Sequence, residues 1–250
     1  MNETAIITGA SSGIGEFTAY KFASEGYDLL LIGRSIERLE KVKNQCQKNS
    51  PEIKVAILSV DLKNFSAAAM NEKLQKLSQV SVLVNNAGIY KKNGPDDSDF
   101  AIWNEIFETN LLGSVKVSQA VWPYFKKNKK GSIVNVASSL GIKPIPTTSA
   151  YSSLKAAMIN WTMSLAQEGA EFNIRANCVC PGLVETPIHD FYNAPAAVKE
   201  SVHKMVLERQ LLQKIGRPEY IAESIFFFGS DKSTWTTGTS QIVDGGITIK

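Results

Sequence analysis

The stretch "TGASSGIG", Thr8–Gly15, decides the fold because it places three glycines between an apolar run and a helical pattern. Residues 4–9 are typical of a buried strand, and the apolar spacing from Gly15 onward predicts a helix. Gly9, Gly13 and Gly15 follow the spacing G-x-x-x-G-x-G. Glycines permit a tight turn and a close approach of the backbone to a pyrophosphate, which the N–H groups of a helix N-terminus attract. A strand-to-helix turn would also use glycines for structural reasons alone.

The same alternation of short apolar runs and helical patterns continues along the chain. Strands are expected at 4–9, 27–33, 54–60, 80–86, 131–138, 173–180 and 239–245. Helices are expected at 15–25, 35–48, 66–78, 99–127, 150–171 and 219–230. Nearly continuous Val, Ile and Leu runs indicate strands covered on both faces. The fold class is therefore α/β, a doubly wound, Rossmann-like, seven-stranded parallel sheet with helices on both faces.

Length and composition favour a single domain over residues 1–250, with the polar insertion at 185–213 as a substrate lid at the carboxyl ends of the strands. The net charge of +3 is too small to predict a nucleic-acid surface. No apolar run approaches the ~20 residues of a membrane span. Cys178 and Cys180 lie on one face of a predicted strand without room for a local bridge, which favours a reducing, cytoplasmic location. We expect small-molecule partners.

The run "SAYSSLKAAM", residues 149–158, places Tyr151 and Lys155 four residues apart, on one face of a predicted helix. A phenol with a pKa near ~10 needs about 4 kcal/mol to exchange protons near neutrality. An ammonium at ~4 Å in an effective dielectric of ~20 supplies about that amount. Singly, a buried tyrosine and a surface lysine are ordinary features; together they predict an acid/base pair.

Five motifs in order resemble the short-chain dehydrogenase/reductase family over nearly the whole chain, and within it the 3-oxoacyl-carrier-protein reductase-like branch. They are "TGASSGIG", "NNAG" at 85–88, the Y-S-S-L-K of the catalytic helix, "CPGLVETPI" at 180–188 and "VDGG" at 243–246. The resemblance implies an oxidoreductase that transfers a hydride between NADP(H) and a carbonyl or secondary alcohol substrate. It also implies a homo-oligomer, a tetramer or a dimer.

The resemblance assigns four catalytic residues. Tyr151 is the general acid/base and Lys155 binds the nicotinamide ribose. Ser138 hydrogen-bonds the reacting oxygen, with Ser139 as the alternative one residue out of register, and Asn110 holds a water that relays protons to Lys155. The cofactor-binding residues besides Tyr151 and Lys155 are Gly9, Ser11, Ser12, Gly13, Ile14, Gly15, Arg34, Asp61, Leu62, Asn86, Ala87, Gly88, Pro181, Gly182, Val184 and Thr186.

Cofactor choice depends on the end of the second strand, where Gly33 and Arg34 stand in place of a carboxylate. A guanidinium can grip a 2′-phosphate through two parallel hydrogen bonds, which favours NADP(H) over NAD(H). Arg34 as a solvated residue at a helix start is the alternative. Asp61 matches the adenine-contacting aspartate of the family, although an aspartate at a strand end is also a common cap.

Other functions remain open at this point. One is an NAD-dependent alcohol or sugar dehydrogenase, and another is a non-catalytic, NADP(H)-sensing regulator. The resemblance to carrier-protein reductases implies basic residues near the ends of two long helices, which would dock an acidic acyl carrier protein. Lys129 supplies the first, but Phe172 occupies the second position, so this docking is doubtful. His189 and His203 lack companion ligands at metal-binding spacing, so no metal is expected.

Two further groups of apolar residues are expected to have roles. Those expected to line a partly apolar substrate pocket are Leu140, Ile142, Ile145, Phe191 and Tyr192. Those on the two long helices, some of which would face another subunit, are Trp103, Phe107, Val115, Met158, Trp161 and Leu165.

Overall fold

The structure, a computed structural model, describes residues 3–96 and 99–250, without the side chains of residues 190 and 191. Its sheet has seven strands in the order β3-β2-β1-β4-β5-β6-β7, all paired in parallel. They are β1 (Glu3–Thr8), β2 (Asp28–Gly33), β3 (Val55–Ser59), β4 (Gln79–Asn85), β5 (Gly131–Val136), β6 (Ile174–Pro181) and β7 (Ser240–Val243). The predicted doubly wound sheet is confirmed.

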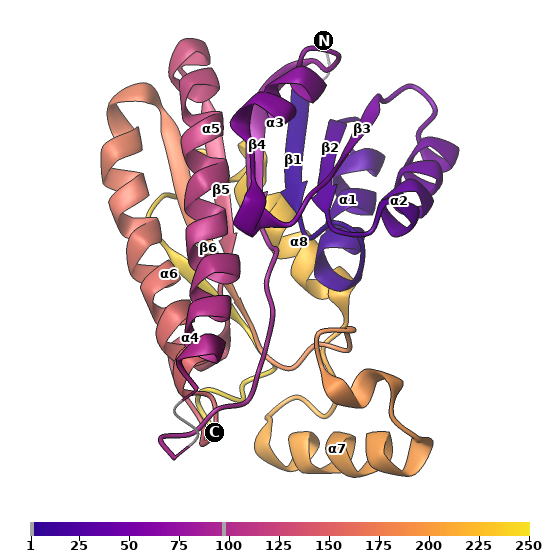
Figure 1. Cartoon of the computed structure of the whole chain (residues 1–250), viewed down its shortest axis with the longest axis vertical. Coiled ribbons are helices and arrows are strands. Elements are labelled where there is room, and N and C mark those ends of the chain that lie inside the picture. The colour runs from indigo at the N-terminus through magenta and orange to yellow at the C-terminus, as the bar shows by residue number, and fades with distance from the viewer. Residues whose placement is uncertain (1–2, 97–98) are drawn as a thin grey trace.

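Helices cover both faces of this sheet (Figure 1). On one face lie α1 (Gly13–Ser24), α2 (Ile36–Asn49) and α8 (Pro218–Gly229), whose apolar residues pack with Ala5 and Ile7 of β1. On the other lie α3 (Ala67–Leu74), α5 (Gly113–Asn128) and α6 (Ser149–Gly169), which pack with Ile6 of the same strand. The alternation of β1 side chains thus divides the core into two layers.

The predicted helix at 99–127 is a continuous helical stretch of three parts. α4 (Phe100–Ile106) leads into a π-helix, Phe107–Leu112, which leads into α5. π-helical turns inside α-helices occur frequently at functional sites. This one contains Asn110, to which the family resemblance assigns a catalytic role.

The insertion at 185–213 contains a short 3-10 helix, Asp190–Asn193, and α7 (Ala196–Arg209). α7 stands apart from the helices that cover the sheet (Figure 1). No described helix is long and apolar enough to cross a membrane.

The strand order reverses direction from β1, with β2 and β3 on one side and β4 to β7 on the other. In open α/β sheets, ligands bind at the carboxyl ends of the strands beside such a switch point. The loops after β1, β4, β5 and β6 therefore define the place to look for a site.

Of the residues expected at a subunit interface, Met158 and Leu165 are buried within their own chain. Phe107 is 42% exposed, so it remains available to a partner. The large number of apolar residues on the two long helices is thus explained in part by the core itself.

Candidate active site

The turn after β1 has the geometry that its glycines predict. Gly9 and Gly13 have φ of +65° and +57°, in the left-handed region that favours glycine. A Cβ added to Gly15 would lie 2.2 Å from the Gly9 carbonyl oxygen, so α1 can approach the turn only without a side chain there. Ser12 is the N-cap of α1, but its side chain makes no capping hydrogen bond. The N-terminus of α1 thus has the backbone geometry that binds phosphate.

The loop after β4 is tied directly to this turn. The backbone N–H groups of Asn86 and Ala87 each donate to Thr8 Oγ1 over 3.0 Å. Asn86 Nδ2 donates to the carbonyl oxygens of Thr8 at 3.0 Å and Gly9 at 3.3 Å. Thr8, which is fully buried, is not among the predicted site residues, and its only sequence signal is that it begins the glycine motif.

The loop after β6 reaches the same glycine turn. A Cβ on Gly13 would lie 3.0 Å from Thr186 Cγ2, which places Thr186 against the glycine turn. Thr186 is buried, and its hydroxyl donates to the Val184 carbonyl over 3.3 Å. Gly182, after Pro181 at the end of β6, donates its N–H to the Val243 carbonyl over 3.0 Å. The turn after β1, the loop after β4 and the loop after β6, which are far apart in the sequence, therefore lie together, as predicted for their cofactor-binding residues.

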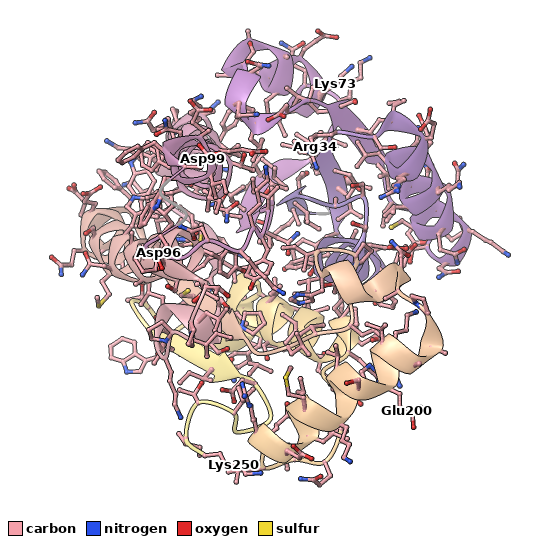
Figure 2. All side chains as sticks on the ribbon, turned by 60° about the horizontal axis from the view of Figure 1, so that its bottom comes forward. Arg34, Lys73, Asp96, Asp99, Glu200 and Lys250 are labelled. Atoms are coloured by element: carbon pink, nitrogen blue, oxygen red, sulfur yellow. The ribbon has the colours of Figure 1, made fainter. Side chains whose placement is uncertain are left out.

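Arg34 is exposed at the end of β2 (Figure 2). The preceding residue, Gly33, lies beside the turn after β1, because a Cβ there would be 3.3 Å from Ser11 Oγ. Asp61 Oδ1 accepts from the Lys63 N–H over 3.0 Å and caps the 3-10 helix Leu62–Asn64. Of the two roles predicted for Asp61, the structure therefore shows the capping role.

Tyr151 and Lys155 lie on one face of α6, as their spacing predicts, and they are 8% and 3% exposed. Lys155 Nζ lies 5.6 Å from the centroid of the Tyr151 ring and donates to the Val136 carbonyl at the end of β5 over 2.7 Å. Two residues later, Ser138 Oγ accepts from the Leu140 N–H over 3.1 Å. The three side chains thus meet where β5 and α6 come together.

Burial dominates the electrostatics of the pair. Burial raises the pKa of Tyr151 to about 12, and a hydrogen bond with Ser138 acts in the opposite direction. Burial lowers the pKa of Lys155 to about 8, against the opposing effect of the nearby thiols of Cys178 and Cys180. The sequence predicts that Lys155 lowers the pKa of Tyr151, whereas in the structure this pKa is raised. Loss of hydration destabilises the phenolate more than the neighbouring groups stabilise it.

The link between Tyr151 and Ser138 also bears on the choice between the two adjacent serines. Ser138 is the serine whose hydrogen bond affects the pKa of Tyr151, whereas the carbonyl oxygen of Ser139 accepts from the N–H groups of Ile142 and Lys143. The geometry favours Ser138.

Asn110 is buried within the π-helix, and both polar atoms of its side chain contact one residue. Its Oδ1 accepts from the Ile89 N–H over 2.8 Å, and its Nδ2 donates to the Ile89 carbonyl over 2.9 Å. Its own carbonyl accepts from Ser114 Oγ over 3.1 Å. Asn110 thus joins the helical stretch to the loop after β4, directly behind Gly88.

Tyr90 is a residue of this site that is absent from the sequence predictions. Its ring packs edge-on against Tyr151, with centroids 5.0 Å apart, and against His189 of the insertion, with centroids 6.1 Å apart. The only available signal was its position two residues after "NNAG". Among the expected pocket residues, Leu140 packs in the same cluster as Tyr151.

The cluster around Tyr151 does not include the other expected pocket residues that the structure describes, Ile142, Ile145 and Tyr192. Ile142 and Ile145 are exposed, and the ring of Tyr192 contacts Lys199 Nζ at 5.7 Å. The side chain of Phe191 lies outside the described residues.

The glycine turn after β1 and the buried Tyr151 and Lys155 near the end of β5 all lie at the carboxyl ends of the strands. This arrangement is typical of an enzyme that binds a dinucleotide cofactor. The family model described as "short chain dehydrogenase" matches residues 3–196, and the chain belongs to this family. A 3-oxoacyl-[acyl-carrier-protein] reductase of Thermotoga maritima is 34% identical over 247 residues, which cover 99% of this chain and 98% of that protein.

Solved structures agree with this assignment. The L-sorbose reductase of Gluconobacter frateurii, solved with NADPH and L-sorbose, superposes with a TM-score of 0.90 at 25% identity, covering 100% of this chain and 97% of that one. Levodione reductase superposes with a TM-score of 0.91 at 26% identity, covering 99% and 97%. The chain is an oxidoreductase of the short-chain dehydrogenase/reductase family.

Proposed function

We propose that this protein is an NADP(H)-dependent oxidoreductase that interconverts a carbonyl group and a secondary alcohol. The observation that carries the proposal is the placement of buried Tyr151 and Lys155 beside Ser138, at the same sheet edge as the uncapped N-terminus of α1. A pair of buried titratable groups at the carboxyl ends of parallel strands is a candidate acid/base site.

The residues present fit a nicotinamide dinucleotide. The glycine turn and the N-terminus of α1 would hold its pyrophosphate, and the exposed guanidinium of Arg34 would hold a 2′-phosphate at the end of β2. Asp61 and Leu62 would lie beside the adenine, and residues 181–186 beside the nicotinamide. The bound cofactor supplies the hydride in reduction and accepts it in oxidation. The solved complex of L-sorbose reductase with NADPH supports NADP(H) as the preferred form.

In reduction, the Tyr151 hydroxyl donates its proton to the substrate oxygen as the carbonyl carbon gains a hydride, so that the C=O bond becomes CH–OH. In oxidation, the same oxygen takes the proton back. Ser138 donates a hydrogen bond to the substrate oxygen and orients it toward Tyr151. Lys155 in its ammonium form binds the nicotinamide ribose and stabilises the phenolate left by proton transfer. Asn110 would hold a water that relays protons to Lys155, and its side chain fixes the loop that carries Gly88 and Ile89.

Residues 185–213 would act as a lid over the substrate. Thr186 at the base of this segment touches the glycine turn, and His189 packs on Tyr90, which packs on Tyr151. Closing such a segment excludes water, which strengthens the electrostatic interactions inside. With this lid included, residues 1–250 would form a single dinucleotide-binding and catalytic domain.

The substrate that fits best is a small, partly apolar carbonyl compound free of a carrier protein. The Thermotoga maritima relative is a 3-oxoacyl-[acyl-carrier-protein] reductase, but here Phe172 occupies the second position expected to be basic. Lys126 Nζ lies 4.2 Å from the centroid of the Phe172 ring, so the phenylalanine contacts a lysine in the last turn of α5. Carrier-protein docking is thus less well supported than a free substrate.

The protein would act as a cytoplasmic homo-oligomer. Its three cysteines are buried and unpaired, which suits a reducing compartment. Phe107 in the π-helix is 42% exposed and Trp235 after α8 is fully exposed, so each is an apolar side chain that a partner subunit would cover. A tetramer would cover both regions.

Titration of the purified protein with NADPH and NADH, followed by nicotinamide fluorescence, tests the proposal. We expect tighter binding of NADPH, with the preference lost in Arg34→Asp, and then consumption of NADPH with members of a carbonyl panel. Tighter NADH binding would favour an NAD-dependent alcohol or sugar dehydrogenase. Tight NADPH binding without turnover, and a Tyr151→Phe variant with unchanged biological effects, would favour an NADP(H)-sensing regulator.

A further inference from the structure

We propose that Asn93, in the loop after β4, is a positioning residue for Tyr151. Its side-chain amide replaces the missing N-terminal cap of α6 and thereby fixes the first turn, which carries the tyrosine. This inference rests on the proposed function of Tyr151 but concerns a residue outside the predicted site.

The N-terminus of α6 lacks a cap from its own sequence. Thr148 is the N-cap residue, and its side chain makes no capping hydrogen bond but instead donates to the Ile145 carbonyl over 2.7 Å. Asn93 Oδ1 accepts from the Ala150 N–H over 3.0 Å. Ala150 is the second residue of the helix, where the N–H normally bonds to an N-cap side chain. Asn93, from the loop after β4, thus supplies the side-chain cap that Thr148 does not supply.

Two backbone contacts hold Asn93 in register with this helix start. Its N–H donates to the Thr147 carbonyl over 3.0 Å, and Asn93 forms an isolated parallel bridge with Thr148. Thr147 has φ of +65°, which is unusual for a β-branched residue and requires support from its surroundings.

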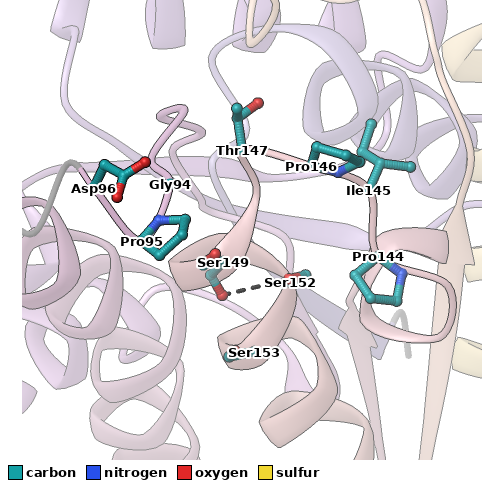
Figure 3. Close-up of a pocket in the computed structure, with 10 residues that line it drawn as sticks. All are labelled: Gly94, Pro95, Asp96, Pro144, Ile145, Pro146, Thr147, Ser149, Ser152 and Ser153. Carbon is teal, nitrogen blue, oxygen red and sulfur yellow. Dashed lines mark hydrogen bonds between the residues drawn. The ribbon is translucent and has the colours of Figure 1, made fainter.

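The surroundings of this contact include an open pocket of about 530 Å³. Figure 3 shows Gly94 and Pro95, which follow Asn93, on one side of it and Thr147 and Ser149 on the other. Packing on that side of the helix start is therefore incomplete, which makes the hydrogen bonds of Asn93 more important for its order.

Tyr151 directly follows Ala150, whereas Lys155 lies one turn deeper and has its own bond to the Val136 carbonyl. Loss of the cap would therefore loosen Tyr151 more than Lys155. Because small displacements of a reacting group lower rates by large factors, the effect should fall on the proton-transfer step more than on cofactor binding.

Asn93 is 1% exposed, and its Nδ2 has no hydrogen-bond partner among the described residues. A buried, unpaired donor is unfavourable for stability. The position is therefore not optimised for stability alone, as is common where a residue serves function.

The test uses Asn93→Leu, which is similar in size but lacks the acceptor, and Asn93→Asp, which keeps an acceptor oxygen. Asp28→Ala is the matched control, since Asp28 Oδ1 also accepts a backbone N–H, that of Lys54 over 2.8 Å, but at the amino end of β2. We expect Asn93→Leu to lower kcat by about 10- to 100-fold with the Kd for NADPH within twofold of wild type. Asn93→Asp should recover kcat to within about fivefold, and Asp28→Ala should lower stability without lowering kcat.

Hydrogen exchange supplies a readout that does not depend on activity. In Asn93→Leu, amides at the start of α6 should exchange faster, and those of its central turns should not. If Asn93→Leu does not fold, Asn93→Ala takes its place. Unchanged kcat in the acceptor-free variant, or equal losses in the Leu and Asp variants, would overturn the proposal. If no variant and no wild-type protein turns over any carbonyl, the proposed function fails, while unchanged exchange at the helix start would show separately that the capping claim fails.

Discussion

Replacing Lys155 by Met should make the protein more stable while abolishing its activity. Burial lowers the pKa of this lysine from 10.5 to about 8, so the ammonium at pH 7 costs about 3 kcal/mol at ~1.4 kcal/mol per pH unit. Met also removes the hydrogen bond to the Val136 carbonyl, a loss of about 1 kcal/mol. The net gain is about 2 kcal/mol, or about 4–8 °C in Tm for a chain of this size.

The pH dependence of this gain has a definite sign. Because the folded-state pKa of Lys155 lies below its ordinary value, its destabilising effect is absent above 10.5, grows as the pH falls toward 8 and is complete below that. Urea unfolding at pH 7 and pH 10 should therefore show a larger advantage for the Met variant at pH 7.

Lys116→Met is the matched control. Lys116 Nζ also donates to a backbone carbonyl, that of Lys63 over 2.9 Å, but the residue is only partly buried. This variant should not gain stability. A Lys155→Met protein that is equal to or less stable than wild type at pH 7 would refute the view that burial of the ammonium opposes folding.

Four further changes test other parts of the site. Tyr151→Phe should lower kcat by at least ~10²-fold in a steady-state assay and leave the fluorescence-measured Kd for NADPH nearly unchanged, because only the proton donor is lost; a variant that retains wild-type kcat would remove the tyrosine from the mechanism. Arg34→Asp should weaken NADPH binding by about 10- to 100-fold, as expected for lost hydrogen bonds to a charged phosphate, and leave NADH binding unchanged or stronger; an equal effect on both would mean that Arg34 does not read the phosphate. The kcat/KM for NADPH should fall as the pH rises through about 8, because the ammonium form of Lys155 is present below its pKa and lost above it. A flat profile from pH 7 to 9 would contradict the role of this ammonium in binding the nicotinamide ribose. Gly15→Ala should reduce folding yield or abolish NADPH binding, because its Cβ would lie 2.2 Å from the Gly9 carbonyl oxygen, and normal binding would show that the turn can move.

Local patterns were sufficient to predict the sheet, because most of its strands, such as β2 and β3, are nearly continuous apolar runs. Tyr151 and Lys155 were also predictable, since their spacing on one helix fixes their common face. The pKa values of Tyr151 and Lys155 could not be predicted in this way. Burial has the largest effect on both, and burial depends on every element that packs around them.

The contacts missed from the sequence join segments that are far apart in the chain. Asn93 caps a helix 57 residues later, and Tyr90 meets Tyr151 only when the loop after β4 folds against α6. The π-helix around Asn110 has no sequence signature of its own, because apolar spacing looks the same through one wider turn. Such features require the tertiary structure.

The measurement that tests the proposed function most directly uses NADPH with deuterium at both C4 positions of the nicotinamide, so that either face delivers the label, and follows the deuterium into the product of a carbonyl panel. Wild-type protein should give an alcohol with one deuterium on the carbinol carbon, and Tyr151→Phe should give almost none over the same time while binding NADPH normally. Oxidation of the labelled NADPH without deuterium in any product, or equal transfer by the two proteins, would contradict hydride transfer assisted by Tyr151.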